Sequence, residues 1–203
     1  MRLFVTGIGT EVGKTVVSAI LTEALQADYW KPVQAGDLDY SDTHKVKDMV
    51  SNSKSVFHDE SFAFNHPMSP HAAAERDGVE ISLGEFKIPE TENHMIIEGA
   101  GGVMVPLNSK DCIIDLIKDL GVEVVLVSRN YLGSINHTLL SVEALVSRGI
   151  SIKGVIFNDV ENVDTESVIL RMTGLKCLGR VEMEEDLTQE VISNYASKFR
   201  EVL

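Results

Sequence analysis

The segment Gly7–Thr15, which reads GIGTEVGKT, places the strongest constraint on the fold. It follows the apolar run Leu3–Thr6 and precedes a stretch in which apolar residues recur at helical spacing. A glycine-rich loop between a buried strand and a helix suits a phosphate group, because the free N–H groups at the helix N-terminus point toward the anion. The sequence therefore predicts a strand, a phosphate-binding loop and an amphipathic helix in this order. The apolar face of this helix is formed by Val17, Ile20, Leu21, Ala24 and Leu25.

Two side chains at the end of this loop add nucleotide chemistry. Lys14 can reach the β- and γ-phosphate oxygens, and the Thr15 hydroxyl can bind Mg²⁺. The spacing is a variant of the standard phosphate loop, because Ile8 rather than a glycine stands five residues before Gly13. The alternative is a glycine turn that only opens a helix. The strand, the glycines, the Gly-Lys-Thr sequence and the helix together favour binding of ATP or GTP.

Apolar runs and helical patterns alternate along the rest of the chain. This alternation is typical of an α/β fold with a mostly parallel sheet flanked by helices, in which ligands bind at the carboxyl ends of the strands. No repeat or linker divides the sequence, so we expect a single domain spanning residues 1–203. The expected strands are Tyr29–Val33, Met95–Glu98, Glu123–Ser128, Lys153–Asn158 and Cys177–Val181, and two later helices carry apolar faces through Ile135, Leu139, Val142 and Val146 and through Leu187, Val191, Tyr195, Phe199 and Val202.

Composition limits the classes of partner. The chain has 31 Asp and Glu against 18 Lys and Arg, and its formal net charge of −13 repels polyanions and disfavours nucleic-acid binding. No apolar run approaches the ~20 residues of a membrane span, and no secretory signal precedes the first expected strand. We therefore expect a cytoplasmic protein that binds no membrane. Cys112 and Cys177 lack the spacing of a disulfide framework or a zinc site, and we expect both to be small buried residues.

A second lysine, Lys31, ends the second expected strand, in the sequence WKPVQAG. The following Pro32 restricts the backbone of Lys31, and the parallel sheet would bring this lysine to the edge where ligands bind. Lys31 is thus a candidate catalytic cation. The alternative is a structural lysine that only caps the end of the strand.

Two acids accompany these lysines. Asp42 lies in the sequence YSDT, and Glu98 ends an apolar strand directly before four residues that read GAGG. Two carboxylates, the Thr15 hydroxyl and phosphate oxygens form the kind of oxygen set that binds Mg²⁺, so we expect Thr15, Asp42 and Glu98 to form a magnesium site. For Asp42, the alternative is an N-cap on the next helix.

The segment Leu132–His137, with the sequence LGSINH, opens another expected helix. A glycine, a hydroxyl and an amide, at Gly133, Ser134 and Asn136, meet free helix N–H groups there, and the helix dipole favours an anion such as a carboxylate. The alternative is that Ser134 or Asn136 serves only as the N-cap.

Six motifs taken together, GIGTEVGKT, KPVQAG, SD, EGAGG, LGSINH and ND, resemble the dethiobiotin synthetase family over most of the chain. The resemblance implies a homodimeric P-loop fold and an ATP- and Mg²⁺-dependent ligase of biotin biosynthesis. Such an enzyme closes the ureido ring of dethiobiotin on 7,8-diaminopelargonate with CO₂. It proceeds through a carbamate and a carbamic–phosphoric anhydride and releases ADP and phosphate.

The resemblance also assigns roles by position. It implies catalytic roles for Lys14 and Lys31, Mg²⁺ binding by Thr15, Asp42 and Glu98, and a substrate carboxylate held at the dimer interface. The implied substrate-binding residues are Lys31, Ala35, Gly133, Ser134 and Asn136. The implied nucleotide-binding residues are Thr10, Glu11, Val12, Gly13, Lys14, Thr15, Val16, Asp42, Glu98, Gly99, Ala100, Gly101, Asn158, Asp159, Glu182, Met183 and Glu184.

The chain departs from the family pattern at three places. Ala35 stands where the family usually has Ser or Thr to contact the carbamate, and Val181–Glu184 replaces an Ile-Pro segment near the nucleotide base. No tyrosine lies between Asp159 and Leu178 to contact the substrate carboxylate. His71 lies near the family's substrate region, where a loop-capping role is an alternative.

Two other functions agree less well with the sequence. An amidoligase that uses glutamine-derived ammonia would carry a glutaminase domain, for which 203 residues leave no room. A nucleotide-switched positioning or partition ATPase would carry a lysine early in the phosphate loop, and Thr6–Gly9 contains none. Such proteins also bind DNA or membranes, which the net charge of −13 disfavours.

Overall fold

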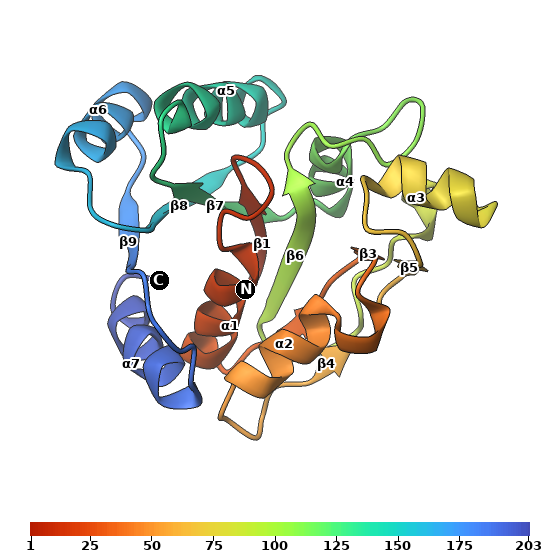
Figure 1. Ribbon diagram of the computed structural model, residues 1–203, viewed down its shortest axis with the longest axis horizontal. Coiled ribbons are helices and arrows are strands. Elements are labelled where there is room, and N and C mark those ends of the chain that lie inside the picture. The colour runs from red at the N-terminus through yellow and green to blue at the C-terminus, as the bar shows by residue number, and fades with distance from the viewer.

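A parallel sheet of seven strands, in the order β4-β2-β6-β1-β7-β8-β9, runs through the protein (Figure 1). The computed structural model describes residues 1–203. Two short strands, β3 and β5, pair in parallel as a separate small sheet. The α/β prediction is confirmed. The strands are β1 (Arg2–Gly7), β2 (Asp28–Trp30), β3 (Val33–Ala35), β4 (Phe57–His58), β5 (Phe62–Phe64), β6 (Met95–Gly102), β7 (Glu123–Arg129), β8 (Ile152–Asn158) and β9 (Cys177–Val181).

Helices cover both faces of the large sheet. α1, α2 and α7 pack together on one face, α5 and α6 pack together on the other, and α4 contacts β6 (Figure 1). α3 contacts the small sheet. No helix is both long and apolar enough to span a membrane. The helices are α1 (Lys14–Leu25), α2 (Asp42–Met49), α3 (Pro70–Asp77), α4 (Ile113–Leu120), α5 (Ser134–Ser147), α6 (Val163–Thr173) and α7 (Gln189–Arg200), with 3-10 turns η1 (Leu38–Tyr40) and η2 (Leu83–Glu85).

The central strands β1, β6 and β7 are buried on both faces, which explains their continuous apolar runs. Their register places the functional segments side by side. Val5 pairs with Glu98, and Gly7 pairs with both Gly102 and Val127. The phosphate loop after β1 therefore emerges beside Glu98 and the glycine-rich end of β6.

Several boundaries differ from the sequence-based expectation. The run Tyr29–Val33 is not one strand, because the chain leaves β2 at Lys31, and Pro32, which lacks an N–H donor, precedes β3. β6 continues to Gly102 rather than ending at Glu98. The strands β4 and β5 were not predicted, since two or three residues are too few to show a period.

The predicted faces of the two later helices were only partly correct. In α5 the expected Val146 is 61% exposed, and the buried positions include Ser134, Thr138 and Leu145. Hydroxyl groups thus occupy much of the face of α5 that packs on the sheet. In α7, Tyr195 and Phe199 are buried as expected, whereas Leu187 precedes the helix and is 41% exposed.

The expectation that both cysteines are buried was wrong. Cys177 is exposed and Cys112 is half-buried. Cys177 begins the edge strand β9, which pairs only with β8, so one side of this strand lies open.

A buried carboxylate, that of Glu166, links α6 to β9 and to the loop after β7 through hydrogen bonds. Glu166 of α6 is 6% exposed and accepts hydrogen bonds from Arg180 of β9, from Asn130 Nδ2 (2.7 Å) and from the Asn162 N–H (3.2 Å). Burial acts to raise the pKa of Glu166, but these donors outweigh it and hold the pKa below its usual 4.5.

We predict that Glu166→Gln destabilises the protein by about 1.5–3 kcal/mol at neutral pH, because Arg180 loses its buried charged partner. Since the folded-state pKa is depressed, the carboxylate stabilises the fold above pH 4.5, and this contribution disappears as the pH falls through the folded-state value. The difference in Tm between the two proteins should therefore shrink as the pH is lowered from 7 to about 3. Asp164→Asn, which changes an exposed acid on the same helix, is the control. A difference in Tm that is independent of pH would contradict the prediction.

Candidate functional site

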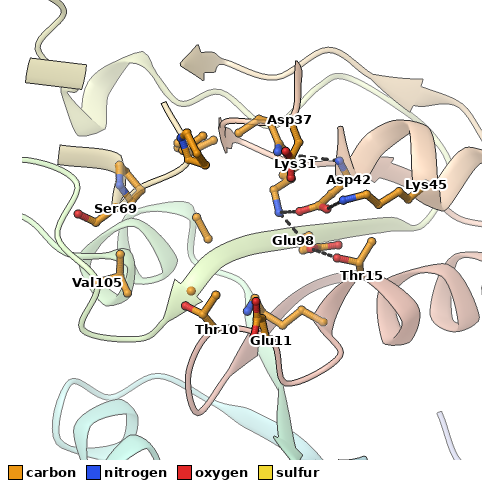
Figure 2. Close-up of a pocket in the computed structure, with 18 of the residues that line it drawn as sticks. Thr10, Glu11, Thr15, Lys31, Asp37, Asp42, Lys45, Ser69, Glu98 and Val105 are labelled. Carbon is orange, nitrogen blue, oxygen red and sulfur yellow. Dashed lines mark hydrogen bonds and ion pairs between the residues drawn. The ribbon is translucent and has the colours of Figure 1, made fainter. Parts of the chain in front are cut away.

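A cavity of about 780 Å³ lies at the carboxyl ends of the strands, between the phosphate loop and the small sheet (Figure 2). Its walls come from the loop before α1, from the end of β6, from β3 and from the segment Pro67–Pro70. It gathers many of the residues singled out from the sequence, namely Thr10, Glu11, Gly13, Lys14, Thr15, Val16, Lys31, Ala35, Asp42, Glu98, Ala100 and Gly101.

Lys31 forms the centre of an ion-pair network in this cavity. Its Nζ lies 2.6 Å from Asp42 Oδ2 and 3.1 Å from Glu98 Oε1, and the residue is only 4% exposed (Figure 2). Burial by itself would lower the pKa of Lys31, but the charges of Glu98 and Asp42 outweigh this effect and raise it. Lys31 is therefore a fixed, fully protonated cation that faces the cavity.

Glu98 is held by three donors. Besides Lys31, the Thr15 hydroxyl donates to Oε1 (2.9 Å) and the Tyr29 hydroxyl donates to Oε2 (2.9 Å). Burial and the charge of Glu98 raise the pKa of Tyr29 well above its usual value, so its hydroxyl remains a donor. Tyr29 was not predicted as a site residue, although its position two residues before Lys31 was the available signal.

Asp42 is the first residue of α2. The N-cap of this helix is Ser41, whose N–H donates to His44 Nδ1 (3.1 Å), so the alternative of Asp42 as the N-cap was wrong. The Asp42 carboxylate instead accepts from Lys31 and, through Oδ1, from Lys45 Nζ (3.1 Å). Burial acts to raise the pKa of Asp42, but Lys31 and then Lys45 lower it. Lys45 also lines the cavity and was not predicted, although it stands one helical turn after Asp42.

Hydrogen bonds within the phosphate loop and from β8 fix the conformation of the loop. Lys14 Nζ donates to the carbonyl of Gly9 (3.0 Å), and burial, with a smaller effect of Lys31, lowers the pKa of Lys14 to about 8. Gly13 has a left-handed backbone with φ +93°, and a Cβ atom there would overlap Asn158 Nδ2. Asn158 Nδ2 donates to the carbonyl of Val12 (2.9 Å). Asn158 therefore positions the loop from the end of β8, which is separated from β1 by β7.

Some residues singled out from the sequence lie outside the large cavity. Val12 is buried inside the loop, and Gly99 packs against Phe4. Asp159 pairs with Arg129 Nε (2.7 Å), and Arg129 Nη1 donates to the carbonyl of Glu11 (3.4 Å). This bridge from β7 to the phosphate loop was not predicted.

The segment after β9 is held by one tyrosine. The Glu182 N–H donates to the Tyr195 hydroxyl (3.1 Å), which in turn donates to Glu184 Oε1 (2.5 Å). Glu182, Met183 and Glu184 are exposed and do not line the large cavity. Tyr195 of α7 thus determines the path of this segment.

The start of α5 also lies outside the large cavity. Its N-cap is Gly133, with φ +103°, so the alternative that Ser134 or Asn136 serves as the N-cap was wrong. Ser134 is buried and its Oγ has no hydrogen-bond partner, whereas Asn136 is exposed. A second hollow of about 390 Å³ lies beside this helix and shares Thr10 and Val105 with the large cavity.

Comparison with known proteins places this geometry in a family. The protein-family model described as an AAA domain matches residues 1–191. The ATP-dependent dethiobiotin synthetase of Christiangramia forsetii is 59% identical over 202 residues, which are 98% of this chain and 96% of the relative. The chain belongs to the dethiobiotin synthetase family. The family's member from Cytophaga hutchinsonii is 51% identical over 97% of this chain and 96% of its own length, and the resemblance seen in the motifs is confirmed.

Solved structures show how the fold of this dethiobiotin synthetase family member is shared. A ParA-family ATPase from Chlorobium tepidum aligns with a TM-score of 0.60 and 16% identity over 97% of both chains. The cell-division ATPase MinD from Pyrococcus furiosus aligns with a TM-score of 0.60 and 12% identity over 100% of this chain and 99% of its own. At such identities the likeness concerns the fold alone.

We predict that Gly13→Ala weakens ATP binding by about tenfold or more, because the left-handed backbone and the overlap with Asn158 force the loop to move. Gly174→Ala is a matched control, since Gly174 has φ +67° at the end of α6 with open space around it. That control should lose about 1 kcal/mol of stability and leave ATP binding unchanged. Isothermal titration calorimetry on both variants makes the comparison, and equal ATP affinities would contradict the prediction.

Proposed function

We propose that this chain is an ATP- and Mg²⁺-dependent ligase that forms the ureido ring of dethiobiotin from 7,8-diaminopelargonate and CO₂, a step of biotin biosynthesis. The observation that carries the proposal is the position of Lys31, held by two carboxylates in a cavity that opens onto the phosphate loop. Membership of the dethiobiotin synthetase family supports it.

In the proposed reaction, one amine of the substrate captures CO₂ as a carbamate. A carbamate oxygen then attacks the γ-phosphate of ATP and forms a carbamic–phosphoric anhydride, with ADP as the leaving group. The second amine attacks the carbamoyl carbon and closes the ring, and phosphate leaves. Because an anionic carbamate has to approach an anionic phosphate, fixed cations lower the barrier. Lys14 and Lys31 supply these charges.

The geometry favours positioning over acid–base catalysis. Holding two reactants in line is worth up to ~7–11 kcal/mol, more than a single proton transfer contributes. Lys31 suits this role, because its contacts to Asp42 and Glu98 fix the ammonium in the buried wall. Ala35 brings no hydroxyl to the same cavity, so the carbamate would be held by these lysines and by the backbone.

The oxygen donors near Lys14 fit a magnesium ion. Thr15 Oγ1 lies 2.9 Å from Glu98 Oε1. Asp42 and Glu98 both accept a hydrogen bond from the Lys31 ammonium, so the two carboxylates lie on the same side of the cavity. Two carboxylates and one hydroxyl suit Mg²⁺, which binds few protein oxygens and completes its shell with water and phosphate oxygens. We therefore assign Thr15, Asp42 and Glu98 to Mg²⁺, which when bound neutralises charge on the phosphates.

The nucleotide site extends from the loop toward β8 and β9. Asn158 donates a hydrogen bond to the carbonyl of Val12 in the loop. Arg129, which is paired with Asp159, donates to the carbonyl of Glu11. We assign the base side of the nucleotide to Asn158, Asp159 and the exposed segment Glu182–Glu184, whose path Tyr195 determines.

An exposed apolar face supports a homodimer. Leu132 is fully exposed, Leu140 and Met104 are 56% and 53% exposed, and Tyr131 is 42% exposed. Met104 and Leu140 line the second hollow together with His137, whose Nδ1 forms a 2.7 Å hydrogen bond with the Tyr131 hydroxyl. We propose that a second copy of the chain covers this face and that Gly133, Ser134 and Asn136 bind the substrate carboxylate there.

The direct test incubates the protein with 7,8-diaminopelargonate, bicarbonate and MgATP and measures dethiobiotin by mass. We expect product from the wild type and a loss of turnover of at least 100-fold in Lys31→Gln, the low end of what one charge-stabilising group contributes. Circular dichroism and Tm establish that the variant is folded. Removal of Mg²⁺ by a chelator should also stop the reaction. A folded Lys31→Gln variant with wild-type turnover would contradict the assignment of Lys31.

A mixing experiment tests the shared site. If Lys31 acts in one subunit and Asn136 in its partner, a mixed dimer of Lys31→Gln and Asn136→Ala chains contains one doubly altered site and one intact site. Each variant alone should be impaired, because every one of its sites lacks either Lys31 or Asn136. Activity should therefore return partly when the two variants are mixed. No recovery, with subunit exchange verified, would rule out a site formed by two chains.

A further inference from the structure

Asp37 is an acidic residue of the large cavity to which no role has been given. It follows β3 directly after Gly36 and lies on the same side of the cavity as Lys31 and Asp42 (Figure 2). Its side chain is exposed and forms no hydrogen bond or ion pair in the structure. It was not singled out from the sequence, where it reads as one acid among several in the segment Gly36–Asp42.

The backbone of Asp37 is held in an unusual conformation. Its φ of 52° and ψ of 36° lie in the left-handed region, which Asp tolerates better than most residues. The preceding Gly36 is fixed by two hydrogen bonds: its N–H donates to Phe64 (2.8 Å) and its carbonyl accepts from Gln34 Nε2 (2.9 Å). A Cβ atom on Gly36 would overlap Pro67. The neighbouring chain thus fixes where the carboxylate of Asp37 is presented.

The usual structural role for an acid at this position is absent. Asp37 stands at the N-cap of η1, yet its side chain forms no capping hydrogen bond. Only its backbone carbonyl takes part in the turn, by accepting from the Tyr40 N–H (3.1 Å). A constrained backbone that presents an unpaired carboxylate to a ligand cavity points to a functional contact.

The other three acids that line the cavity either have partners of their own or lie on the phosphate loop. Asp42 is paired with two lysines, and Glu98 accepts from Lys31, Thr15 and Tyr29. Glu11 lies on the phosphate loop, on the nucleotide side. Asp37 is therefore the carboxylate on the β3 side that remains available to a cationic ligand.

We propose that Asp37 is a further substrate-binding residue, whose carboxylate binds an ammonium group of the vicinal diamine substrate. The inference rests on the proposed function, because the diamine is the cationic ligand of that reaction, while ATP, the carbamate and the substrate tail are anionic. A charged hydrogen bond between carboxylate and ammonium orients one amine while the other carries the carbamate. The contact binds the ammonium form. This amine loses its proton to solvent before it attacks the carbamoyl carbon, and Asp37 has no part in that transfer.

The test compares Asp37→Asn with Asp39→Asn. Asparagine keeps the left-handed preference of position 37 and removes only the charge, and Asp39 is an exposed acid of the same turn that does not line the cavity. We expect Asp37→Asn to raise the KM for 7,8-diaminopelargonate about tenfold and to leave the KM for ATP and the Mg²⁺ requirement unchanged. Asp39→Asn should change none of them. Asp37→Gly, which also keeps the backbone conformation, should repeat the loss.

Binding of monoamines without ATP gives a second measurement. Titration calorimetry compares 7,8-diaminopelargonate with 7-aminopelargonate and 8-aminopelargonate. In the wild type, removal of the amine that contacts Asp37 should weaken binding about tenfold, and in Asp37→Asn the same removal should have no effect.

The outcomes separate this inference from the proposed function. Dethiobiotin formation by the wild type together with unchanged diamine binding in Asp37→Asn overturns the role of Asp37 and leaves the ligase intact. A changed Mg²⁺ or ATP requirement in Asp37→Asn also overturns it, because Asp37 would then serve the nucleotide. A wild type that neither binds the diamine nor forms dethiobiotin overturns both.

Discussion

A lysine ammonium buried between two carboxylates is the constraint on which the site depends. Burial of an unpaired charge costs several kcal/mol, so Lys31 is tolerated only because Asp42 and Glu98 both contact it. Glu98 in turn needs Thr15 and Tyr29. These residues come from α1, the end of β2, α2 and β6. The network therefore forms only when four separate segments have packed together.

The parallel sheet makes this convergence possible. Every strand of the large sheet ends at the same edge, so the loops after β1, β2 and β6 emerge as neighbours. Glu98 pairs with Val5, two residues before Gly7, where the phosphate-loop segment begins. A single edge thereby carries the cations, the acids and the free N–H groups of α1.

The sequence predicted most where the local signal was strong. The central strands are buried on both faces and read as long apolar runs. Lys31 and Glu98 stand out because a charged residue at the end of an apolar strand is rarely needed for packing, and Lys14 stands out because it follows the glycines of the phosphate loop. The short strands β4 and β5 left no period to detect. The buried face of α5 was misplaced because Ser134, Thr138 and Ser141 occupy it. Tyr29 and Lys45 stand near predicted residues along the chain, but the contact of Tyr29 with Glu98 and the place of Lys45 in the cavity wall depend on tertiary folding. Asp37 reads as one acid among several in its segment, and only the folded chain brings it to the cavity.

The small sheet of β3 and β5 gives the cavity a wall that the large sheet does not form, although Val33 and Phe64 pack in the same hydrophobic core as the large sheet. One wall, formed by the phosphate loop and β6, belongs to the large sheet, whereas Ala35, Asp37 and Pro67 are carried on or beside the small one. In the proposed reaction the nucleotide lies at the first wall and the acceptor at the second, so substitutions in the small sheet would change the acceptor side first. With this arrangement, a protein of this kind could evolve to use a new acceptor while its nucleotide site stays the same. The strands β3 and β5 and their loops are therefore the natural place to redesign substrate choice.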